Sequence, residues 1–136
     1  MKKKSHFRVG ILGLTFTGAN LGCQALGYSF LNVLQQISEK NQWNIELYIM
    51  DGVGIRYALT KKGYIKSVLP DYECKNINYH LVPLFYDWKQ KLVENCIKKC
   101  DIVFDFTAGD SFTDIYGQER FEQRTNLKGK VIEYQV

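Results

Sequence analysis

Prolines, histidines and long hydrophobic runs are scarce in this sequence. Its 136 residues include two prolines and two histidines, and no stretch approaches the ~20 apolar residues that span a bilayer. The short apolar run from Val9 to Phe16 leads into polar residues without a small-residue cleavage site, so it indicates a buried strand and not a targeting signal. We therefore expect residues 1–136 to form one soluble, cytoplasmic domain around a single core.

A strong excess of charge of one sign is also lacking. The chain has 18 Lys and Arg against 14 Asp and Glu, which gives a formal net charge of +4. Much of that excess lies at Lys2, Lys3 and Lys4, and the rest of the sequence is nearly balanced. Because no basic stripe follows, we expect no nucleic-acid partner.

The four cysteines, Cys23, Cys74, Cys96 and Cys100, match no common cysteine framework. Cys96 and Cys100 are spaced to share a helix face, but with His80 they are too few and wrongly spaced for a structural zinc site. A disulfide framework is not expected without a secretory signal. The sequence predicts reduced, mostly buried thiols and no metal site.

Strand-like and helix-like patterns alternate along the chain. Strands are predicted at 7–14, 45–50, 64–69, 76–84, 101–106 and 130–134, and helices at 20–41, from 87 to about 100, and from 111 onward. The segment 53–62 is compatible with a short helix or a loop. This alternation predicts an α/β fold with a Rossmann-like, doubly wound and mainly parallel sheet.

Helical spacing and capping residues describe the expected helices further. The first helix is expected to bury a stripe of Leu26, Phe30, Val33, Leu34 and Ile37. The second is expected to bury a stripe of Trp88, Leu92, Cys96 and Cys100. Asp87 with Gln90, and Ser111 with Asp114, resemble capping boxes that open the second and third helices.

The first loop whose residues are suited to ligand binding runs from Gly13 to Gly22, between the predicted first strand and the predicted first helix. Gly13 and Gly18 match the opening of a P-loop, but Ala19 and Asn20 replace its Lys-Ser/Thr pair. The glycine spacing does not fit a dinucleotide-binding loop either. Free amides at a helix amino terminus suit an anion or sugar hydroxyls, whereas the alternative is that the glycines only turn the chain tightly.

The second loop follows Asp105, which interrupts an apolar strand and needs donors nearby to stay charged. Asp110 comes directly after Gly109, where the backbone can approach a ligand closely. A turn is the ordinary alternative role for Asp110, as helix capping is for Asp114. Because ligands of such sheets bind at the carboxyl ends of the strands, Asp110 is the best candidate for accepting a hydroxyl proton or orienting a sugar.

Both loops resemble signatures of one enzyme family. The run from Gly10 to Gly13, continued by Thr17 to Leu26, is similar to the opening of the polysaccharide pyruvyl transferases, and the run from Phe106 to Gly117 resembles their second signature. The two motifs stand in the family's order and on matching strand–loop–helix elements. Members of that family are similar to two-lobed GT-B glycosyltransferases, so the resemblance implies that this chain corresponds to the amino-terminal lobe.

The resemblance implies a transferase of polysaccharide biosynthesis that moves a pyruvyl group from phosphoenolpyruvate to a sugar hydroxyl of a polysaccharide or its precursor. Phosphoenolpyruvate is then the donor substrate, and no cofactor is implied. Asp110 is the candidate catalytic residue. The candidate substrate-binding residues are Thr17, Gly18, Asn20, Gly22, Gly109 and Ser111. The family's conserved histidine and most donor-binding arginines are expected in a second, carboxyl-terminal lobe or in a separate chain that supplies it, without which this chain is expected to be inactive.

Two other functions are compatible with the sequence. The polar glycine loop suits a non-catalytic α/β module that binds a nucleotide or a sugar phosphate. A protein-interaction role is expected instead if apolar surface that a second lobe would cover is left bare. Binding of sugar nucleotides, sugar phosphates and NAD tests the first alternative, and the oligomeric state tests the second.

Overall fold

A computed structural model of the whole chain describes residues 5–14, 21–51, 75–83, 87–106 and 117–136. The strand predicted at 64–69, the segment 53–62 and the capping box at Ser111 and Asp114 lie outside the described residues.

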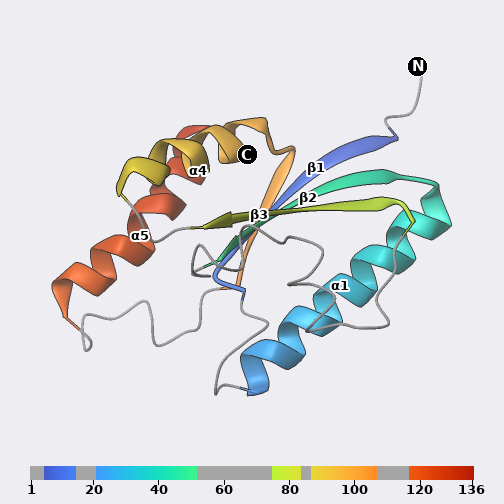
Figure 1. Cartoon of the computed structure of the whole chain (residues 1–136), viewed down its shortest axis with the longest axis horizontal. Helices are drawn as coiled ribbons and strands as arrows, with labels where there is room; N and C mark the ends of the chain where they lie inside the picture. The colour runs from blue at the N-terminus through green and yellow to red at the C-terminus, as the bar shows by residue number, and fades with distance from the viewer. Residues whose placement is uncertain (1–4, 15–20, 52–74, 84–86, 107–116) are drawn as a thin grey trace.

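Within the described ranges, four strands form one parallel sheet (Figure 1). They are β1 (His6–Leu12), β2 (Asn44–Asp51), β3 (Ile77–Pro83) and β4 (Ile102–Asp105), in the order β3-β2-β1-β4. The buried run of β1 from Val9 to Leu12 is typical of a strand that is covered on both faces. The predicted strands at 7–14, 45–50, 76–84 and 101–106 are confirmed with small shifts at their ends.

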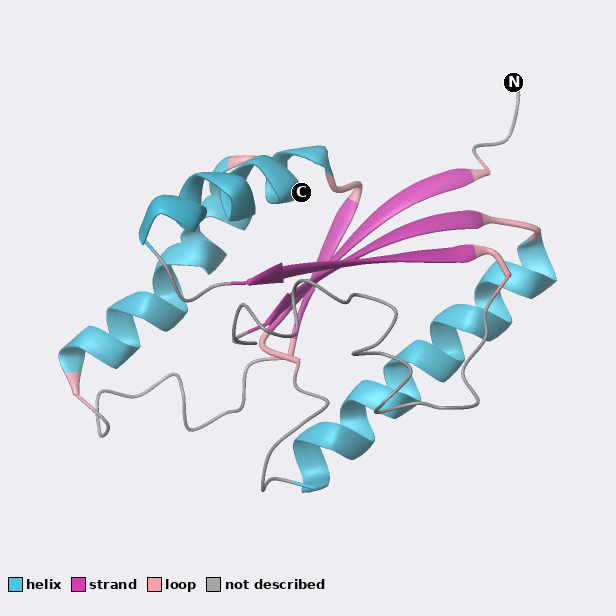
Figure 2. Cartoon of the chain, viewed as in Figure 1, coloured by secondary structure: helices cyan, strands magenta, loops and turns pink. Residues whose placement is uncertain are grey.

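Helices cover both faces of this sheet (Figure 2). Helix α1 (Leu21–Asn41) packs on one face, and α4 (Asp87–Lys99) and α5 (Gln118–Glu133) pack on the other. Each connection from one strand to the next parallel strand is expected to be right-handed, so helices that lead in opposite directions across the sheet fall on opposite faces. The chain is a small α/β fold with a parallel sheet, as the sequence predicts.

The alternation of side chains along the strands divides the core into two layers. The layer under α1 contains Val9, Ile11, Leu14, Leu31, Leu34, Ile45, Leu47, Ile49 and Ile77. The layer under α4 and α5 contains Leu12, Met50, Val82, Val93 and Ile97. Several aromatic rings close the edge of the first layer, and Phe30 lies 5.1 Å from Phe104 and 4.9 Å from Phe106 between ring centroids.

The buried face of α1 differs from the predicted one. Its buried residues are Gly27, Leu31, Leu34 and Ser38, whereas Leu26, Val33 and Ile37 are exposed and only Leu34 of the predicted stripe is buried. Gly27 has no side chain to hold α1 away from the sheet. The buried Ser38 hydroxyl donates to the backbone oxygen of Trp43 at 2.7 Å, which satisfies its hydrogen-bonding need.

The buried face of α4 is also offset from the predicted stripe. Val93, Ile97 and Cys100 are buried, whereas Leu92 is exposed and Cys96 is half-buried. The side chain of Trp88 lies outside the described residues. Periodicity alone does not identify the buried face here, because α4 carries apolar residues on two adjacent stripes. Packing against the sheet determines which of the two stripes is buried.

The strand predicted at 130–134 is wrong, because α5 runs to Glu133. Leu127, Val131 and Tyr134 fall on one side at helical spacing and pack on the core layer that contains α4. The Tyr134 hydroxyl donates to Glu94 Oε2 at 3.3 Å, which ties the end of α5 to α4. Burial of one helical face outweighs the strand-like composition of this short segment.

The start of α5 is set by a glycine. Gly117 is the N-cap residue, with φ +98°, and no side-chain cap bond is made. Only glycine adopts this backbone region without strain. The described helix therefore begins directly after Gly117.

Gly10 lies in the middle of β1 on the face that α4 covers, and it allows the closest packing in the core. A Cβ atom there would lie 2.9 Å from Met50 Cε and 3.0 Å from both Cys100 Sγ and Val103 Cγ2. We expect Gly10→Ala to lower the free energy of unfolding by about 1–3 kcal/mol, because three neighbours must shift at once. Urea denaturation followed by circular dichroism measures this change.

Gly129→Ala is the matched control. A Cβ at Gly129 would meet nothing within 4 Å, and Gly129 lies within α5. The same substitution should therefore stabilise the protein by about 0.5–1 kcal/mol through helix propensity. Equal stability of Gly10→Ala and the wild-type protein would show that the core around β1 is not as close-packed as described.

Candidate functional site

The carboxyl ends of β1 and β4 lie side by side. Leu12 pairs with Asp105 in the parallel register, and the Phe106 amide donates to the Leu12 carbonyl oxygen at 2.8 Å. Strands β2 and β3 follow β1 on one side of it in the sheet, whereas β4 pairs with β1 on its other side. Such a reversal of strand order opens a crevice beyond the strand ends, where open α/β sheets bind their ligands.

The segment that leaves β1 is shaped for a close backbone approach. Gly13 has φ +72°, in the left-handed region that favours glycine. Leu14 is buried in the core and anchors the start of the turn. Helix α1 begins at Leu21 and has no acidic residue in its first turn. Its free amides and its dipole therefore favour an anion at this edge of the sheet.

The candidate site residues are only partly described. Gly22 lies in the exposed first turn of α1. The other candidates lie outside the described residues: Thr17, Gly18, Asn20, Gly109, Asp110 and Ser111. Their segments follow Leu14 and Phe106 in the sequence, which are residues at the carboxyl ends of the two adjacent strands β1 and β4.

An ion pair that the sequence analysis missed lies at the same edge. Lys128 Nζ, from α5, lies 3.1 Å from Asp105 Oδ2, and the Lys128 side chain is only 17% exposed. The expected need of Asp105 for a nearby donor is confirmed. The helical spacing of Leu127, Val131 and Tyr134 was the signal that could have placed Lys128 beside the sheet, but that segment was predicted partly as a strand.

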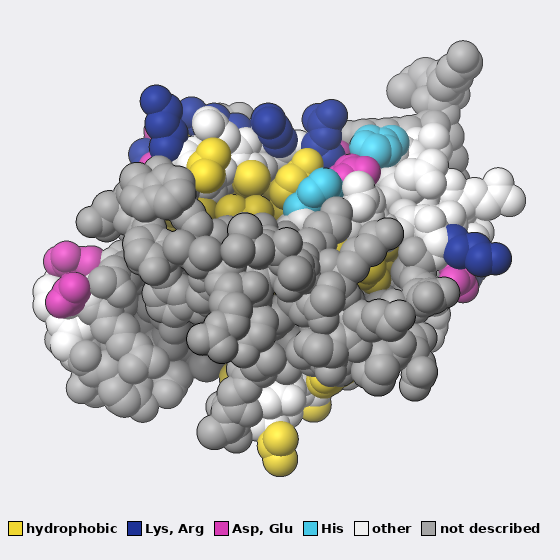
Figure 3. Space-filling model, in the orientation of Figure 1, with side chains coloured by type: hydrophobic (Ala, Val, Ile, Leu, Met, Phe, Trp, Pro, Cys, Tyr) yellow, Lys and Arg dark blue, Asp and Glu magenta, His cyan; other side chains and the backbone are white. Residues whose placement is uncertain are grey.

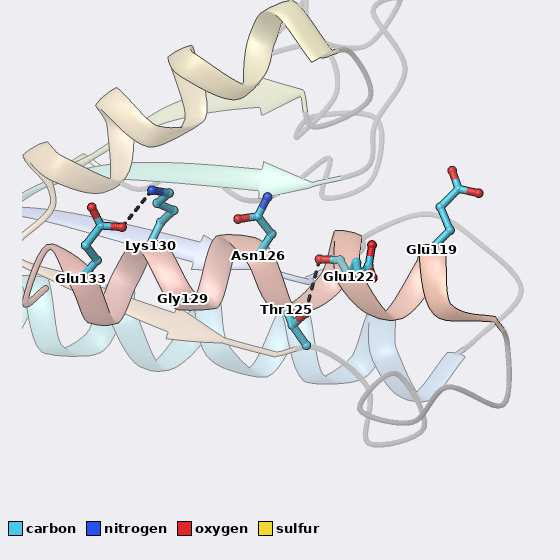
Figure 4. A pocket seen from close by; sticks show the side chains of 7 residues that line it. All are labelled: Glu119, Glu122, Thr125, Asn126, Gly129, Lys130 and Glu133. Carbon is cyan, nitrogen blue, oxygen red and sulfur yellow. Dashed lines mark hydrogen bonds and ion pairs between the residues drawn. The ribbon is translucent and has the colours of Figure 1, made fainter.

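A shallow pocket runs along the outer face of α5 (Figure 4). Its described lining residues are Glu119, Glu122, Thr125, Asn126, Gly129, Lys130 and Glu133. Lys130 Nζ donates to Glu133 Oε2 at 2.8 Å, and the Thr125 hydroxyl donates to the Phe121 carbonyl oxygen at 2.9 Å. These groups bond within their own helix, so the pocket has the character of a solvated acidic helix face.

A polar cluster lies on the sheet face near the opposite, amino-terminal half of the strands. His80 Nε2 and a Glu46 carboxylate oxygen are in direct contact, and Asn78 Nδ2 donates to the same oxygen at 3.0 Å. The ring of Tyr48 stacks on that of His80 with centroids 4.7 Å apart. Figure 3 shows histidine (cyan) and acidic (magenta) side chains next to one another in the upper part of the view. The cluster joins the edge strand β3 to β2.

Partial burial acts to raise the pKa of Glu46, but hydrogen bonds from His80 and Asn78, together with the charges of His80 and His6, outweigh it and lower this pKa below 4.5. Burial and the charge of Glu46 raise the pKa of Tyr48 above 10.0. The carboxylate is therefore held in its charged form and is fully engaged in the contact between the two strands.

The thiols of Cys96 and Cys100 have little reactivity. Burial raises the pKa of Cys100 to about 12, and burial also raises the pKa of Cys96. Cys100 Sγ donates to the Cys96 backbone oxygen at 3.2 Å. Cys23, Cys96 and Cys100 form no disulfide, and Cys74 lies outside the described residues. Because the thiolate is the nucleophile, Cys96 and Cys100 are packing residues at neutral pH.

Comparisons of the sequence with models of protein families and with curated proteins, and of the structure with solved structures, found no match. Among the described residues, no group of three or more His, Cys, Asp or Glu side chains is arranged to hold a metal ion. None of the helices described has the length and apolar character that crossing a membrane requires.

The lowered pKa of Glu46 predicts a pH dependence of stability. A carboxyl group whose folded pKa lies below its unfolded value stabilises the protein above the unfolded pKa, and this contribution is lost as the pH falls through the folded pKa. The advantage of the wild-type protein over Glu46→Gln should therefore shrink between about pH 5.5 and about pH 3. Urea denaturation of both proteins at several pH values measures it.

Glu119→Gln, at the exposed start of α5, changes the net charge equally and serves as the control. Its stability relative to the wild-type protein should change much less over the same pH range. A constant difference between wild type and Glu46→Gln from pH 5.5 to pH 3 would contradict the described contacts of Glu46.

Proposed function

We propose that this chain is the acceptor-binding lobe of a pyruvyl transferase that acts on a polysaccharide or its precursor. The donor is phosphoenolpyruvate, and the acceptor is a sugar hydroxyl. The observation that carries this proposal is the adjacency of the carboxyl ends of β1 and β4. The two sequence motifs that resemble the pyruvyl transferases follow these two strand ends, at the edge where sheets of this kind bind ligands.

The reaction divides naturally between two lobes. In ketal formation one sugar hydroxyl adds to C2 of phosphoenolpyruvate while an acid protonates the methylene carbon, and a second hydroxyl of the sugar then displaces the phosphate from C2. The reaction therefore requires that acid, cations for the phosphate and carboxylate, and a group that deprotonates a sugar hydroxyl. We assign the last role to Asp110. We assign the acid and most cations to a second lobe, in the same polypeptide or in a separate chain, as in the two-lobed GT-B arrangement.

The start of α1 supports an additional role in holding an anion or sugar hydroxyls. Gly13 turns the chain in a left-handed conformation, and no acidic residue occupies the first turn of α1. We therefore assign the contacts to the sugar and its phosphate groups to the loop that contains Thr17, Gly18 and Asn20, together with Gly22.

The same observation favours one alternative function. A helix amino terminus without nearby acidic residues binds phosphate without any catalytic base, so a non-catalytic module for a nucleotide or a sugar phosphate is the second candidate. Isothermal titration calorimetry with sugar phosphates, sugar nucleotides, phosphoenolpyruvate and NAD distinguishes the candidates. Micromolar binding of NAD would contradict the pyruvyl transferase proposal.

Substitution of Asp110 tests the catalytic assignment. If Asp110 removes a proton or binds sugar hydroxyls as an anion, Asp110→Asn should lower turnover on the order of 10²-fold or more and leave the fold intact. Turnover is measured as phosphate release from phosphoenolpyruvate, with the second lobe supplied. Asn suits turns as well as Asp does, so a purely structural role predicts little change.

Asp114→Asn is the comparison variant, because a capping role predicts a stability loss of about 1 kcal/mol at most and no large loss of turnover. Wild-type turnover by Asp110→Asn, together with a clearly lower melting temperature, would leave Asp110 as a turn residue only.

A further inference from the structure

Asp105 is the more exposed member of an ion pair at the carboxyl edge of the sheet. Its side chain is 32% exposed, whereas that of Lys128, whose Nζ lies 3.1 Å from Asp105 Oδ2, is 17% exposed. Asp105 is the last residue of β4 and pairs with Leu12, the last residue of β1. The carboxylate is therefore accessible at the edge where sheets of this kind bind ligands, and its counterion is the more buried partner.

The face on which Asp105 lies follows from the alternation of side chains along β4. Val103, two residues earlier, packs in the core layer under α4 and α5, whereas Phe104 and Phe106 pack against the layer under α1. Side chains two residues apart on a strand share a face. Asp105 therefore lies on the face that α5 covers, at the carboxyl-terminal limit of that layer.

The ion pair is not needed to hold α5 on the sheet. Leu127, Val131 and Tyr134 of α5 already pack against the apolar layer. Removal of an ammonium and a carboxylate from water costs free energy that their attraction only roughly offsets, and apolar residues of similar size stabilise such a contact equally well. A charged pair at this edge is better explained by the binding of a polar ligand.

We propose that Asp105 accepts hydrogen bonds from hydroxyl groups of a sugar ligand, and that Lys128 is a positioning residue that holds the carboxylate in place and balances its charge. A carboxylate has about four acceptor positions, so the contact with Lys128 uses only part of this capacity. The positive charge of Lys128 also reduces the repulsion between Asp105 and a phosphate group on the same sugar.

The position of Asp105 on a strand suits this role. The next residue, Phe106, donates its amide to the Leu12 carbonyl oxygen at 2.8 Å, which fixes the end of β4 against β1. Polar groups that stand on strands are placed more precisely than groups on loops, and a few such groups determine which ligand a site accepts. The role differs from that assigned to Asp110, which is to remove a proton.

The inference rests on the proposed function for the location of the site and for the sugar as ligand, but it does not require pyruvyl transfer. Binding of glucose 1-phosphate, galactose 1-phosphate and mannose 1-phosphate to the full chain tests it, with inorganic phosphate as the reference. NMR titration up to about 20 mM ligand detects weak binding. The wild-type protein should bind at least one of the three sugar phosphates more tightly than inorganic phosphate.

Asp105→Asn should weaken binding of that sugar phosphate on the order of tenfold, because hydrogen bonds to a charged acceptor are lost. Binding of inorganic phosphate should stay within about twofold of the wild type, since it uses no sugar hydroxyl. A variant that had lost its fold would lose both ligands, so the difference between the two ligands separates a binding role from a structural one.

Lys128→Met should also weaken binding of the sugar phosphate, and Lys128→Arg, which keeps the charge, should bind closer to the wild type than Lys128→Met does. Lys130→Met is the matched control, because it removes a lysine that pairs with Glu133 on the same helix. This variant should bind as the wild type does.

Four results would overturn the inference: no preference of the wild type for any of the three sugar phosphates, unchanged affinity of Asp105→Asn, equal loss of both ligands in that variant, or no recovery with Lys128→Arg. Binding with the expected pattern but without pyruvyl transfer would contradict the proposed function alone. Pyruvyl transfer with unchanged acceptor affinity in Asp105→Asn would contradict this inference alone.

Discussion

The central strand β1 is the constraint on which the remaining structure depends. It pairs with β2 along its whole length and with β4 at its carboxyl half, so every layer of the protein contacts it. Gly10 removes a side chain where Met50, Cys100 and Val103 converge. This close packing lets β4 lie beside β1 while α4 covers them both. The candidate site is a direct consequence, because it lies where these two strands end.

The sheet could be predicted from the sequence because its strands supply most of the buried hydrophobic residues. Continuous apolar runs such as that around Val9 and Ile11 have no solvent-facing alternation, which is typical of parallel strands. The faces of α1 and α4 could not be predicted by the same means. Leu26 and Leu31 are equally apolar, and only contact with the sheet decides which is buried. Composition also misled at the carboxyl end, where Val131 packs as part of a helix and not as part of a strand.

The candidate site could be predicted in outline but not in detail. Glycines and short polar residues after two buried strands indicated its two loops, and the strand order brings the ends of those strands together. The ion pair of Asp105 with Lys128 was not predicted, because the segment that contains Val131 and Tyr134 was interpreted as a strand and not as the helix that brings Lys128 to the sheet. The contact of Glu46 with His80 was likewise not predicted from the sequence, since β2 and β3 are brought together only in the folded sheet.

Mapping of ligand binding by NMR tests the central claim that the site lies at the carboxyl ends of β1 and β4. Amide chemical shifts of the ¹⁵N-labelled chain are followed during titration with a sugar phosphate. The predicted result is that the largest changes occur at Gly13, Leu14, Gly22 and Phe106, at or near these strand ends. Changes concentrated instead around Asn44 and Asn76, at the amino-terminal edge of the sheet, would contradict it.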